Sequence, residues 1–579
     1  MMGYEYIAIV ASRGLPPERP IPGTEAASLL DGDRLIPHAL SPGIVVYVKR
    51  TARPLRLPHG GLLIGHLFSR SCDQITDASR LPDTADARSL RRLLIERYWG
   101  DYVLFLGDAD HFSATRDPSG GVNLLHFMNG DAAILTSDIG LAIRLGLYRK
   151  STDWSYISHR LVFPSLKTTR TGLMGVRELL PGCTLTVRSG ETRVSQDWSP
   201  WKFVEPARRQ GTAEEAAASV RSAITGVIQG WTKVDRDILL ELSGGLDSSI
   251  VGACLQDSGA RVACCTITTP VPGADERMYA RPVADLLGAE LEAVGLDVRS
   301  SEFDFLQTAD IATPRIGVLH HATDRIMEAA AERHEATSFY SGGGGDSIFC
   351  YLPTAAPAAD ALRERGASAG LQSIRDLAEL HQCTLWTAGR LAIRKLLRPA
   401  QLPWRTDSLF LSRQMDCTPE THPWFDAPRQ AFQGDRERIF GLATTQVYRD
   451  SAARGRRRHL RLPLLSQPVM EACLGVPSWM WIGHGRNRAI ARAAFADLLP
   501  PEVLNRRSKG TFRPFLGAFY VENKRRIQDF LRGGQLQSHG MLDAEALAGF
   551  FDSPLPPRDH AFSRVLDLCA TENWLRHHS

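Results

Sequence analysis

The stretch ILLELSGGLDSSIVGACL, residues 238–255, places two glycines, an aspartate and three serines between two apolar runs. The run before Ser243 has the length and composition of a buried strand, and the run after Asp247 has the period of a helix. A strand that ends in Ser-Gly-Gly and continues as a helix gathers unpaired backbone N–H groups at the positive end of the helix dipole. The stretch therefore predicts a phosphate-binding turn between a strand and a helix.

The side chains of this turn suit phosphate binding. Glycine lets the backbone approach a ligand closely, serine hydroxyls donate hydrogen bonds, and a carboxylate can hold Mg²⁺ against phosphates. The predicted binding residues are Ser243, Gly244, Gly245, Asp247, Ser248 and Ser249. The alternative is a tight strand–helix turn whose serines only cap the helix.

A second glycine-rich loop lies about a hundred residues later, in ATSFYSGGGGDSIFCYL, residues 336–352. In open α/β sheets, loops of this kind converge at the carboxyl ends of the strands. We therefore expect Asp346 to share a magnesium ion with Asp247. A flexible turn without a ligand is the alternative for this loop alone.

Length and composition indicate an ordinary globular protein of two or three domains. The chain has 579 residues, of which 43% are hydrophobic and 23% charged, and its net charge of +4 does not favour nucleic-acid binding. Its ten cysteines show no CxxC pair or zinc spacing, which is typical of reduced thiols. No signal peptide and no long apolar run is present, so we expect a cytoplasmic protein that does not cross a membrane.

The chain divides into two predicted domains with different patterns. Residues 1–205 alternate short apolar segments with turns, which predicts a mostly β domain with few helices. In residues 206–579 strands alternate with helices, which predicts a doubly wound parallel sheet, and from about residue 355 only helical patterns remain. The predicted fold class is α+β followed by α/β with a helical extension.

The two loops together resemble the synthetase domain of the asparagine synthetase family. SGGLDSS is similar to the pyrophosphate loop of ATP pyrophosphatases, whose ATP-binding domain is adenine-nucleotide α-hydrolase-like. The resemblance implies that ATP and Mg²⁺ are bound, with both aspartates as magnesium ligands. It further implies that Ser341 and Gly342 lie beside the nucleotide and that Ile267 lines the adenine pocket.

The first domain resembles the glutaminase domain of the same family, an Ntn-type hydrolase. The similar segments include GGLLIGHLFSR (60–70) and WGDYVLFLGD (99–108). The family's nucleophile is the cysteine that follows the initiator methionine, but residue 2 here is Met2 and the first cysteine is Cys72. We therefore expect an inactive domain, and the amine must come from the substrate or from free ammonia.

Later segments resemble lasso peptide cyclases, which join a peptide's N-terminal amine to an internal Asp or Glu side chain. These segments include THPWF (421–425), RLPLLSQPVMEACLGVPSWMW (461–481) and GRNRAIARAAFADLLPPEVLNRRSKGTF (485–512). The resemblance implies a precursor core peptide as substrate, AMP and pyrophosphate as products, and Lys509 as the catalytic lysine. It also implies a leader-binding protein and a leader peptidase as potential partners.

Two departures from the small-molecule members of the family favour a bulky substrate. Gly343 and His459 stand where those enzymes carry larger or acidic functional groups, so we expect open space at both positions. His459 is a candidate proton acceptor, with a structural histidine as the alternative. The run ARGRRRHLR (453–461) favours a solvated surface, and otherwise a patch that grips phosphate or an acidic partner. A β-lactam-synthetase-like ligase and an ammonia-dependent asparagine synthetase remain the alternative functions.

Overall fold

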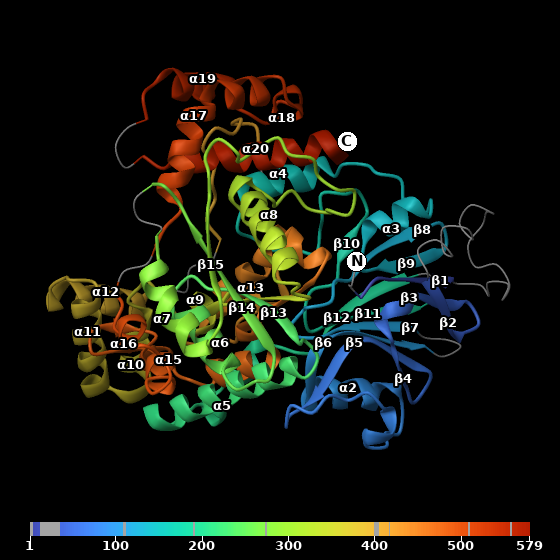
Figure 1. The fold of residues 1–579 in the computed structure, drawn as a ribbon, viewed down its shortest axis with the longest axis horizontal. Coiled ribbons are helices and arrows are strands. Elements are labelled where there is room, and N and C mark those ends of the chain that lie inside the picture. Colours follow the sequence, from blue (N-terminus) through green and yellow to red (C-terminus); the bar gives the residue numbers. More distant parts are fainter. Residues whose placement is uncertain are drawn as a thin grey trace.

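The fold is described from a computed structural model of the chain. The structure describes residues 4–11, 35–107, 112–188, 191–271, 275–398, 404–415, 417–507, 510–555 and 559–578. A β-rich N-terminal part, up to about residue 196, lies on one side of a larger C-terminal part built around a parallel sheet (Figure 1).

The N-terminal part contains two antiparallel six-stranded sheets. The first sheet has the order β10-β8-β9-β1-β3-β2, with β1 (Tyr6–Ala11), β2 (Leu35–Ser41), β3 (Ile44–Lys49), β8 (Leu125–Asn129), β9 (Ala132–Thr136) and β10 (Arg177–Glu178). The second has the order β12-β11-β7-β6-β5-β4, with β4 (Leu55–Leu57), β5 (Gly61–Ser69), β6 (Tyr98–Gly107), β7 (Phe112–Arg116), β11 (Cys183–Arg188) and β12 (Glu191–Gln196).

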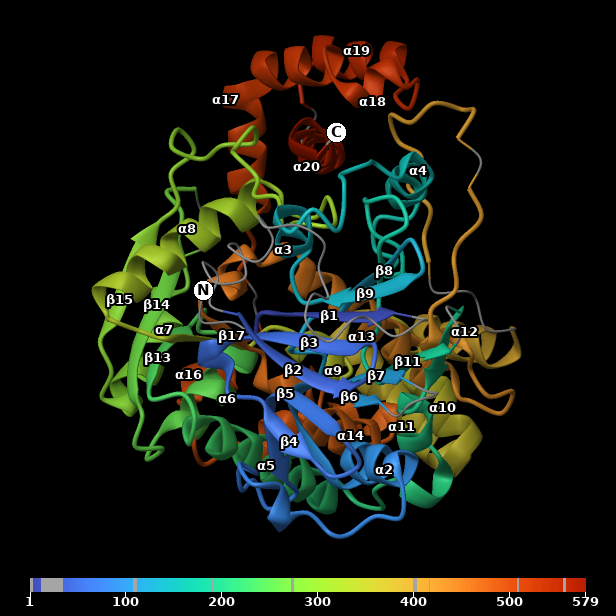
Figure 2. The ribbon, with the colours of Figure 1, turned by 90° about the vertical axis from the view of Figure 1, so that its right-hand side faces the viewer.

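The two sheets pack face to face, as Figure 2 shows. Alternate residues of their strands, such as Val46 and Phe105, form one buried core between them. The outer faces are covered by α2 (Ala87–Arg97) on the second sheet, and by α3 (Ile139–Arg144) and α4 (Trp154–Val162) on the first. Each sheet thus buries both faces, which gives a helix–sheet–sheet–helix layering.

The C-terminal part is organised by a five-stranded parallel sheet of order β15-β14-β13-β16-β17. Its strands are β13 (Asp237–Glu241), β14 (Arg261–Thr268), β15 (Leu291–Gly295), β16 (Ser338–Ser341) and β17 (His459–Arg461). One face is covered by α5 (Ala213–Thr232), α6 (Leu246–Leu255) and α7 (Arg277–Leu287), and the other by α8 (Val318–Arg333). The predicted fold class is therefore confirmed.

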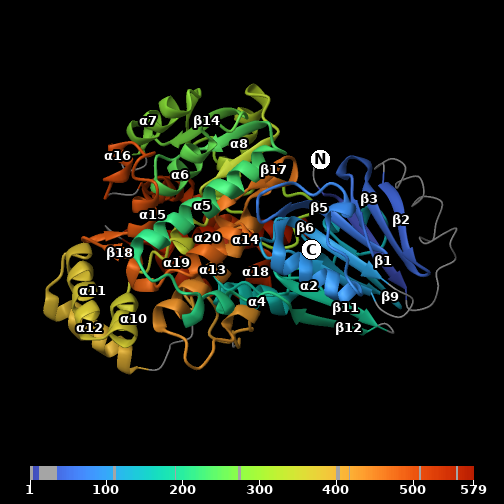
Figure 3. The ribbon, with the colours of Figure 1, turned by 90° about the horizontal axis from the view of Figure 1, so that it is seen from below.

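The rest of the C-terminal part is mainly helical. Its helices are α9 (Gly345–Ile348), α10 (Ala356–Arg365), α11 (Ala367–Leu380), α12 (Leu385–Leu397), α13 (Gln433–Ser451), α14 (Gln467–Leu474), α15 (Ala489–Ala494), α16 (Pro501–Leu504), α17 (Arg513–Arg532), α18 (Gln535–Ser538), α19 (Ala544–Asp552) and α20 (Ala561–His578), with a small hairpin of β18 (Ile482–Gly483) and β19 (Arg486–Asn487). Helices α10 to α12 lie at the end far from the N-terminal part (Figure 3).

The prediction that strands end before residue 355 is wrong at β17. This strand adds the fifth member of the parallel sheet, next to β16. It has only three residues, one of them a buried arginine, so it lacks the apolar run by which a buried strand is recognised.

The two parts share cores. Phe68 and Trp99 of the N-terminal part pack with Trp231 of α5, and α20 packs in the cluster that includes Ile157 of α4. The predicted boundary near residue 205 falls among short 3₁₀ turns between β12 and α5. The ten cysteines are all free thiols, and no helix in the described ranges is long and apolar enough to cross a membrane.

The arginine run 453–461 is not a solvated surface. Arg461 is 2% exposed and donates to Asp101 of β6 (2.9 Å) and to Asp235 (2.9 Å), while Arg454 pairs with Glu241 and Asp324. Arg461 also stacks 3.8 Å above the ring of Trp231. The ion pairs of Arg454 and Arg461 therefore hold the run against the parallel sheet. Arg461 also joins the two parts of the chain through its ion pair with Asp101.

We predict that Arg461→Met destabilises the protein strongly. The substitution leaves Asp101 and Asp235 buried without their cation, which costs roughly 3 to 5 kcal/mol. Denaturant unfolding followed by tryptophan fluorescence measures the loss. Arg261→Met is the matched control, because its pair with Asp237 is exposed and contributes about 1 kcal/mol or less. Equal effects of the two substitutions would contradict this account.

Candidate functional site

The two glycine-rich loops meet at the carboxyl end of the parallel sheet. The first loop follows β13 and leads into α6, and the second follows β16 and leads into α9. Because β13 and β16 are adjacent parallel strands, their carboxyl ends lie at one edge. Both loops line a cavity of about 660 Å³, which we call the loop cavity.

Glycine is required where the loops touch. A Cβ on Gly342 would lie 2.5 Å from the backbone nitrogen of Ser248, and one on Gly345 would lie 2.3 Å from Cγ of Asp247. Gly244 has φ +67°, and a Cβ there would lie 2.6 Å from Cβ of Tyr279. Each loop therefore needs glycine to admit the other or the neighbouring helix α7.

The first loop is held in shape by its own serines. Ser248 Oγ accepts from the backbone N–H of Ser243 (3.2 Å), and the N–H of Gly245 donates to Ser243 Oγ (3.3 Å). Gly245 is the N-cap of α6 and offers no side-chain cap, so the start of the helix faces the cavity uncapped. This arrangement leaves backbone N–H groups and the positive dipole end available to an anion.

Asp247 and Asp346 converge on one cation of the chain itself. Arg488, the N-cap of α15, donates to Oδ1 of Asp247 (2.9 Å) and to Oδ1 of Asp346. Both carboxylates line the loop cavity. The two carboxylates thus reach one cation of the chain, and their predicted sharing of a magnesium ion stays a prediction.

The donor set fits magnesium rather than an all-protein metal site. In the part of the chain that the structure describes, no group of three or more His, Cys, Asp or Glu side chains is arranged to hold a metal ion. Magnesium is commonly bound by one or two carboxylates together with substrate phosphates. Asp247 and Asp346 are the residues that would hold it.

Four arginines line the loop cavity beside the two loops, and we call them the arginine wall. They are Arg488, Arg492, Arg506 and Arg507. Burial lowers the pKa of Arg492 to about 10, and the nearby Arg488 contributes to the same shift. Arg506 donates to the carbonyl of Gly244 (3.1 Å) and pairs with Glu276. These guanidinium groups are of the kind that binds polyphosphate, although Arg488 and Arg506 are paired with carboxylates of the chain.

Several predicted residues lie around this cavity. Ser243, Gly245, Asp247, Ser248, Ser341, Gly342 and Asp346 line it. Gly244 shapes the turn, while Ser249 is buried behind it and its Oγ has no hydrogen-bond partner among the described residues. Lys509 lies outside the described residues, two positions beyond the cavity-lining Arg507.

Ile267 lies near the carboxyl end of β14, where it pairs with Val294. It is partly buried and packs against the small cluster that contains Leu296 and Phe515. It does not belong to the lining of the loop cavity. Its predicted contact with adenine stays a prediction.

The structure does not bring His459 to the loops. It pairs with Ser338 at the start of β16, three residues before Ser341, which corresponds to roughly 10 Å along the strand. It faces the N-terminal part, with its ring 5.0 Å from that of Tyr4, and burial lowers its pKa to about 4. The predicted role as proton acceptor is therefore not supported by its position.

The space expected at Gly343 is occupied. A Cβ on Gly343 would lie 3.0 Å from Cε1 of Tyr448, a residue of α13 that lines the loop cavity. The small residue thus admits a tyrosine rather than leaving a void. Sequence reasoning did not find Tyr448, because its neighbours in α13 have no motif.

The arginine wall was also missed, although a signal for it was present. Arg488, Arg492, Arg506 and Arg507 all lie in the segment 485–512, which was singled out for its resemblance and not for its charge. Glu276 is the N-cap of α7. Its pairing with Arg506 and with the N–H of Gly510 (3.0 Å) places it beside the first loop.

Comparisons with curated proteins found two relatives of low sequence identity. Two curated relatives are amidase chyE of Penicillium rubens, 25% identical over 41% of this chain and 38% of its own length, and amidase chry2 of Gibberella zeae, 26% identical over 43% and 39%. The chain thus spans about two fifths of the length of these relatives.

Two solved structures were also found to be similar. One is described as the allosteric regulatory enzyme of purine biosynthesis, at 10% identity over 59% of this chain and 84% of that chain, with a TM-score of 0.21. The other is glutamine phosphoribosylpyrophosphate amidotransferase from B. subtilis, at 11% identity over 59% and 76%, with a TM-score of 0.20. Scores of this size carry no argument about the fold, and the description of the fold rests on the strand order and the helix packing of this chain.

The strongest comparison is with a protein family. The family model described as asparagine synthase matches residues 219–576, more than half of the chain and nearly all of the C-terminal part. Both glycine-rich loops and the arginine wall fall inside this match. The chain belongs to the asparagine synthase family.

Proposed function

We propose that the chain is a lasso peptide cyclase, an AMP-forming ligase that closes a macrolactam in a precursor core peptide. The side-chain carboxylate of an Asp or Glu attacks the α-phosphorus of ATP, and pyrophosphate leaves. The peptide's N-terminal amine then attacks the acyl-adenylate, AMP leaves, and a proton is released. The observation that carries the ATP chemistry is the convergence of Asp247 and Asp346 on Arg488 between the two loops.

The loop cavity suits the phosphates of ATP. The uncapped start of α6 and four arginines provide donors to phosphate oxygens, and two carboxylates are available for the metal. Magnesium, when bound there, neutralises the charge on the leaving pyrophosphate. The chain's own arginines stabilise the same charge, and we assign Lys509 a similar role near the reacting carboxylate.

A peptide substrate is favoured by the walls of the loop cavity. Pro164 and Ser165 of the N-terminal part line it together with the C-terminal loops. Holding about ten peptide residues in a pre-closed shape costs roughly 10 to 20 kcal/mol of conformational entropy, which contacts to two reacting groups do not offset. A wall from the second part of the chain enlarges the surface that can hold the peptide and bring its ends together.

Two other members of the same family are the alternatives. A β-lactam-synthetase-like ligase closes a small molecule, and an ammonia-dependent asparagine synthetase uses a free amine. Tyr448 fills the space at Gly343 and narrows the loop cavity, which is compatible with either of these two alternative functions. The segments THPWF and RLPLLSQP and the wall from the N-terminal part favour the cyclase. A leader-binding protein and a leader peptidase are proposed partners.

We predict that the purified chain, ATP, Mg²⁺ and a candidate core peptide give AMP and pyrophosphate in equal amounts. The peptide product is lighter by one water, because one amide bond forms. Mass spectrometry and a pyrophosphate assay measure both. The matched control is the same peptide with an acetylated N-terminus, which should not be cyclised. Formation of ADP, or turnover only with added ammonium, would contradict the proposal.

We also predict that Asp247→Asn and Asp346→Asn each weaken the dependence of pyrophosphate release on Mg²⁺. Each substitution removes one carboxylate charge, and the Mg²⁺ concentration for half-maximal rate should rise roughly 10-fold to 100-fold. A magnesium titration at saturating ATP measures this value.

Asp237→Asn is the matched control for this titration. Asp237 begins β13, at the opposite end of the strand from the loop, and is partly exposed. Its substitution should leave the magnesium dependence unchanged. Normal magnesium dependence in both loop variants would mean that the metal is held elsewhere.

A further inference from the structure

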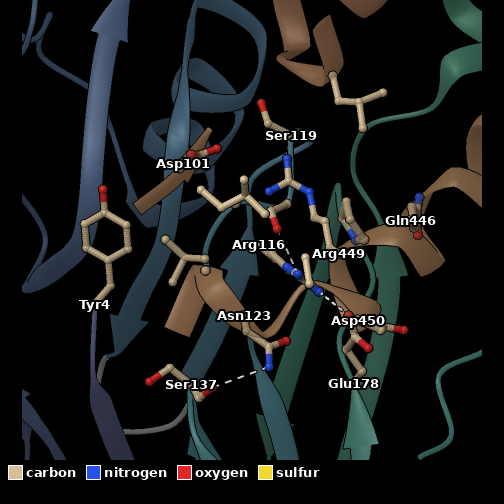
Figure 4. Close-up of a pocket in the computed structure, with 18 of the residues that line it drawn as sticks. Tyr4, Asp101, Arg116, Ser119, Asn123, Ser137, Glu178, Gln446, Arg449 and Asp450 are labelled. Carbon is tan, nitrogen blue, oxygen red and sulfur yellow. Dashed lines mark hydrogen bonds and ion pairs between the residues drawn. The ribbon is translucent and has the colours of Figure 1, made fainter. Parts of the chain in front are cut away.

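A second cavity lies between the two parts of the chain, on the other side of α13 from the loop cavity. It has a volume of about 240 Å³, and we call it the interface cavity. Thr444, Val447 and Tyr448 of α13 face the loop cavity, whereas Leu442, Gln446 and Arg449 face the interface cavity. Figure 4 shows Gln446 and Arg449 projecting from this helix into the space beside Ser119 and Glu178 of the N-terminal part.

Arg449 is a cation without a counter-ion in this cavity. Three other arginines line it, and each is ion-paired: Arg116 with Glu178, Arg456 with Asp310, and Arg461 with Asp101 and Asp235. Among the residues that the structure describes, none forms a hydrogen bond or an ion pair with the guanidinium of Arg449. Burial lowers its pKa, although the nearby Asp101 and Asp117 act in the opposite direction. The cavity therefore holds one arginine that makes no direct ion pair among the described residues, although carboxylates such as Asp101 and Asp138 also line it.

Two neutral donors beside Arg449 also lack partners. Within the described ranges, Nε2 of Gln446 and Nε1 of Trp424 are buried and have no hydrogen-bond partner. Both residues line the interface cavity. Buried polar groups are nearly always hydrogen-bonded, so unpaired donors grouped at one cavity call for a ligand or water that supplies acceptors.

The orientation of Gln446 is fixed by its neighbour His422. Nδ1 of His422 accepts from the backbone N–H of Trp424 (3.0 Å), so the ring carries its proton on Nε2. That proton is donated to Oε1 of Gln446 (3.3 Å), which leaves the buried amide nitrogen without a partner among the described residues. Burial lowers the pKa of His422 to about 4, so the ring stays neutral. The segment THPWF thus serves to present donors to the cavity.

We propose that the interface cavity binds a carboxylate on a short apolar chain, held by Arg449, Gln446 and Trp424. A carboxylate supplies acceptors only and neutralises Arg449, since arginine and carboxylate pair through two parallel hydrogen bonds. Trp424, Leu442 and Met470 form an apolar wall that suits a carbon chain better than a phosphate. The small volume admits a short acid or the end of a longer molecule.

The carboxylate has two possible sources, a free short-chain acid or the C-terminus of a peptide substrate. Only the second source rests on the proposed function. The two cavities share α13, so a peptide carboxylate bound at Arg449 would lie one helix width from the loop cavity. Direct binding measurements separate the sources and do not require turnover.

The test is calorimetric titration of the full chain with butyrate, with butyramide as the uncharged control. We expect butyrate to bind and butyramide not to bind, and Arg449→Met to weaken butyrate binding roughly 10-fold to 100-fold. Trp424→Phe, which keeps the ring and removes the N–H, should weaken it by a smaller factor. Arg390→Met, on the exposed side of α12, should have no effect.

The same titration is repeated with a core peptide bearing a C-terminal carboxylate or a C-terminal amide. If the peptide with a C-terminal carboxylate binds more tightly than the peptide amide, and Arg449→Met abolishes this difference, the peptide is the source. If only butyrate binds more tightly than its amide, the source is a free acid. If neither probe depends on Arg449, the cavity holds only water and the proposal is overturned. Failure to release pyrophosphate would instead count against the proposed function and leave these binding results unchanged.

Folding of the variant is checked by its thermal midpoint. Arg449 has no ion pair among the described residues, so removing its buried charge should leave the midpoint unchanged or raise it. A purely structural arginine would lower the midpoint on substitution. A lowered midpoint together with unchanged butyrate binding would overturn the proposal.

Discussion

The site depends on the direct contact of two backbone loops from adjacent strands. Gly342 and Gly345 of the second loop lie against Asp247 and Ser248 of the first at distances that admit no Cβ. This contact fixes the separation of the two aspartates, one on each loop. It also opens the start of α6 to the cavity, because the second loop approaches from the side and does not cap the helix. A phosphate site and a paired-carboxylate site are therefore created by one packing constraint.

Arg488 compensates the negative charge of the two aspartates that this packing brings together. Two carboxylates in a partly buried cavity repel each other, and the guanidinium satisfies both of them. A magnesium ion bound between the same carboxylates would compete with this arginine, which would then be free to face the phosphates. The same side chain would thereby stabilise the site before nucleotide binds and hold nucleotide afterwards.

The elements that depend on local sequence were the predictable ones. The strand–glycine–helix order of residues 238–255 placed β13, the first loop and α6 correctly, and adjacency of parallel strands placed Asp346 near Asp247. Features that depend on packing between distant segments were missed. The strand β17 is recognised only by its pairing with β16, and Tyr448 is recognised only by its contact with Gly343. The role of Arg461 is recognised only by its partners in the two parts of the chain. His459 was misplaced for the same reason, since an alignment position does not tell which end of a short strand faces the site.

The N-terminal part contributes more than support to the C-terminal sheet. If its role were only to cover an apolar face, the interface would be apolar, and its charges would be paired. Instead the interface holds a cavity whose arginines are paired except Arg449, and whose open donors belong to α13 and the THPWF segment. Buried unpaired donors destabilise a fold, so a sequence that keeps two of them, on Gln446 and Trp424, beside one cavity carries a cost that a bound acceptor removes. This cost is the physical argument for treating the interface as a binding surface in its own right.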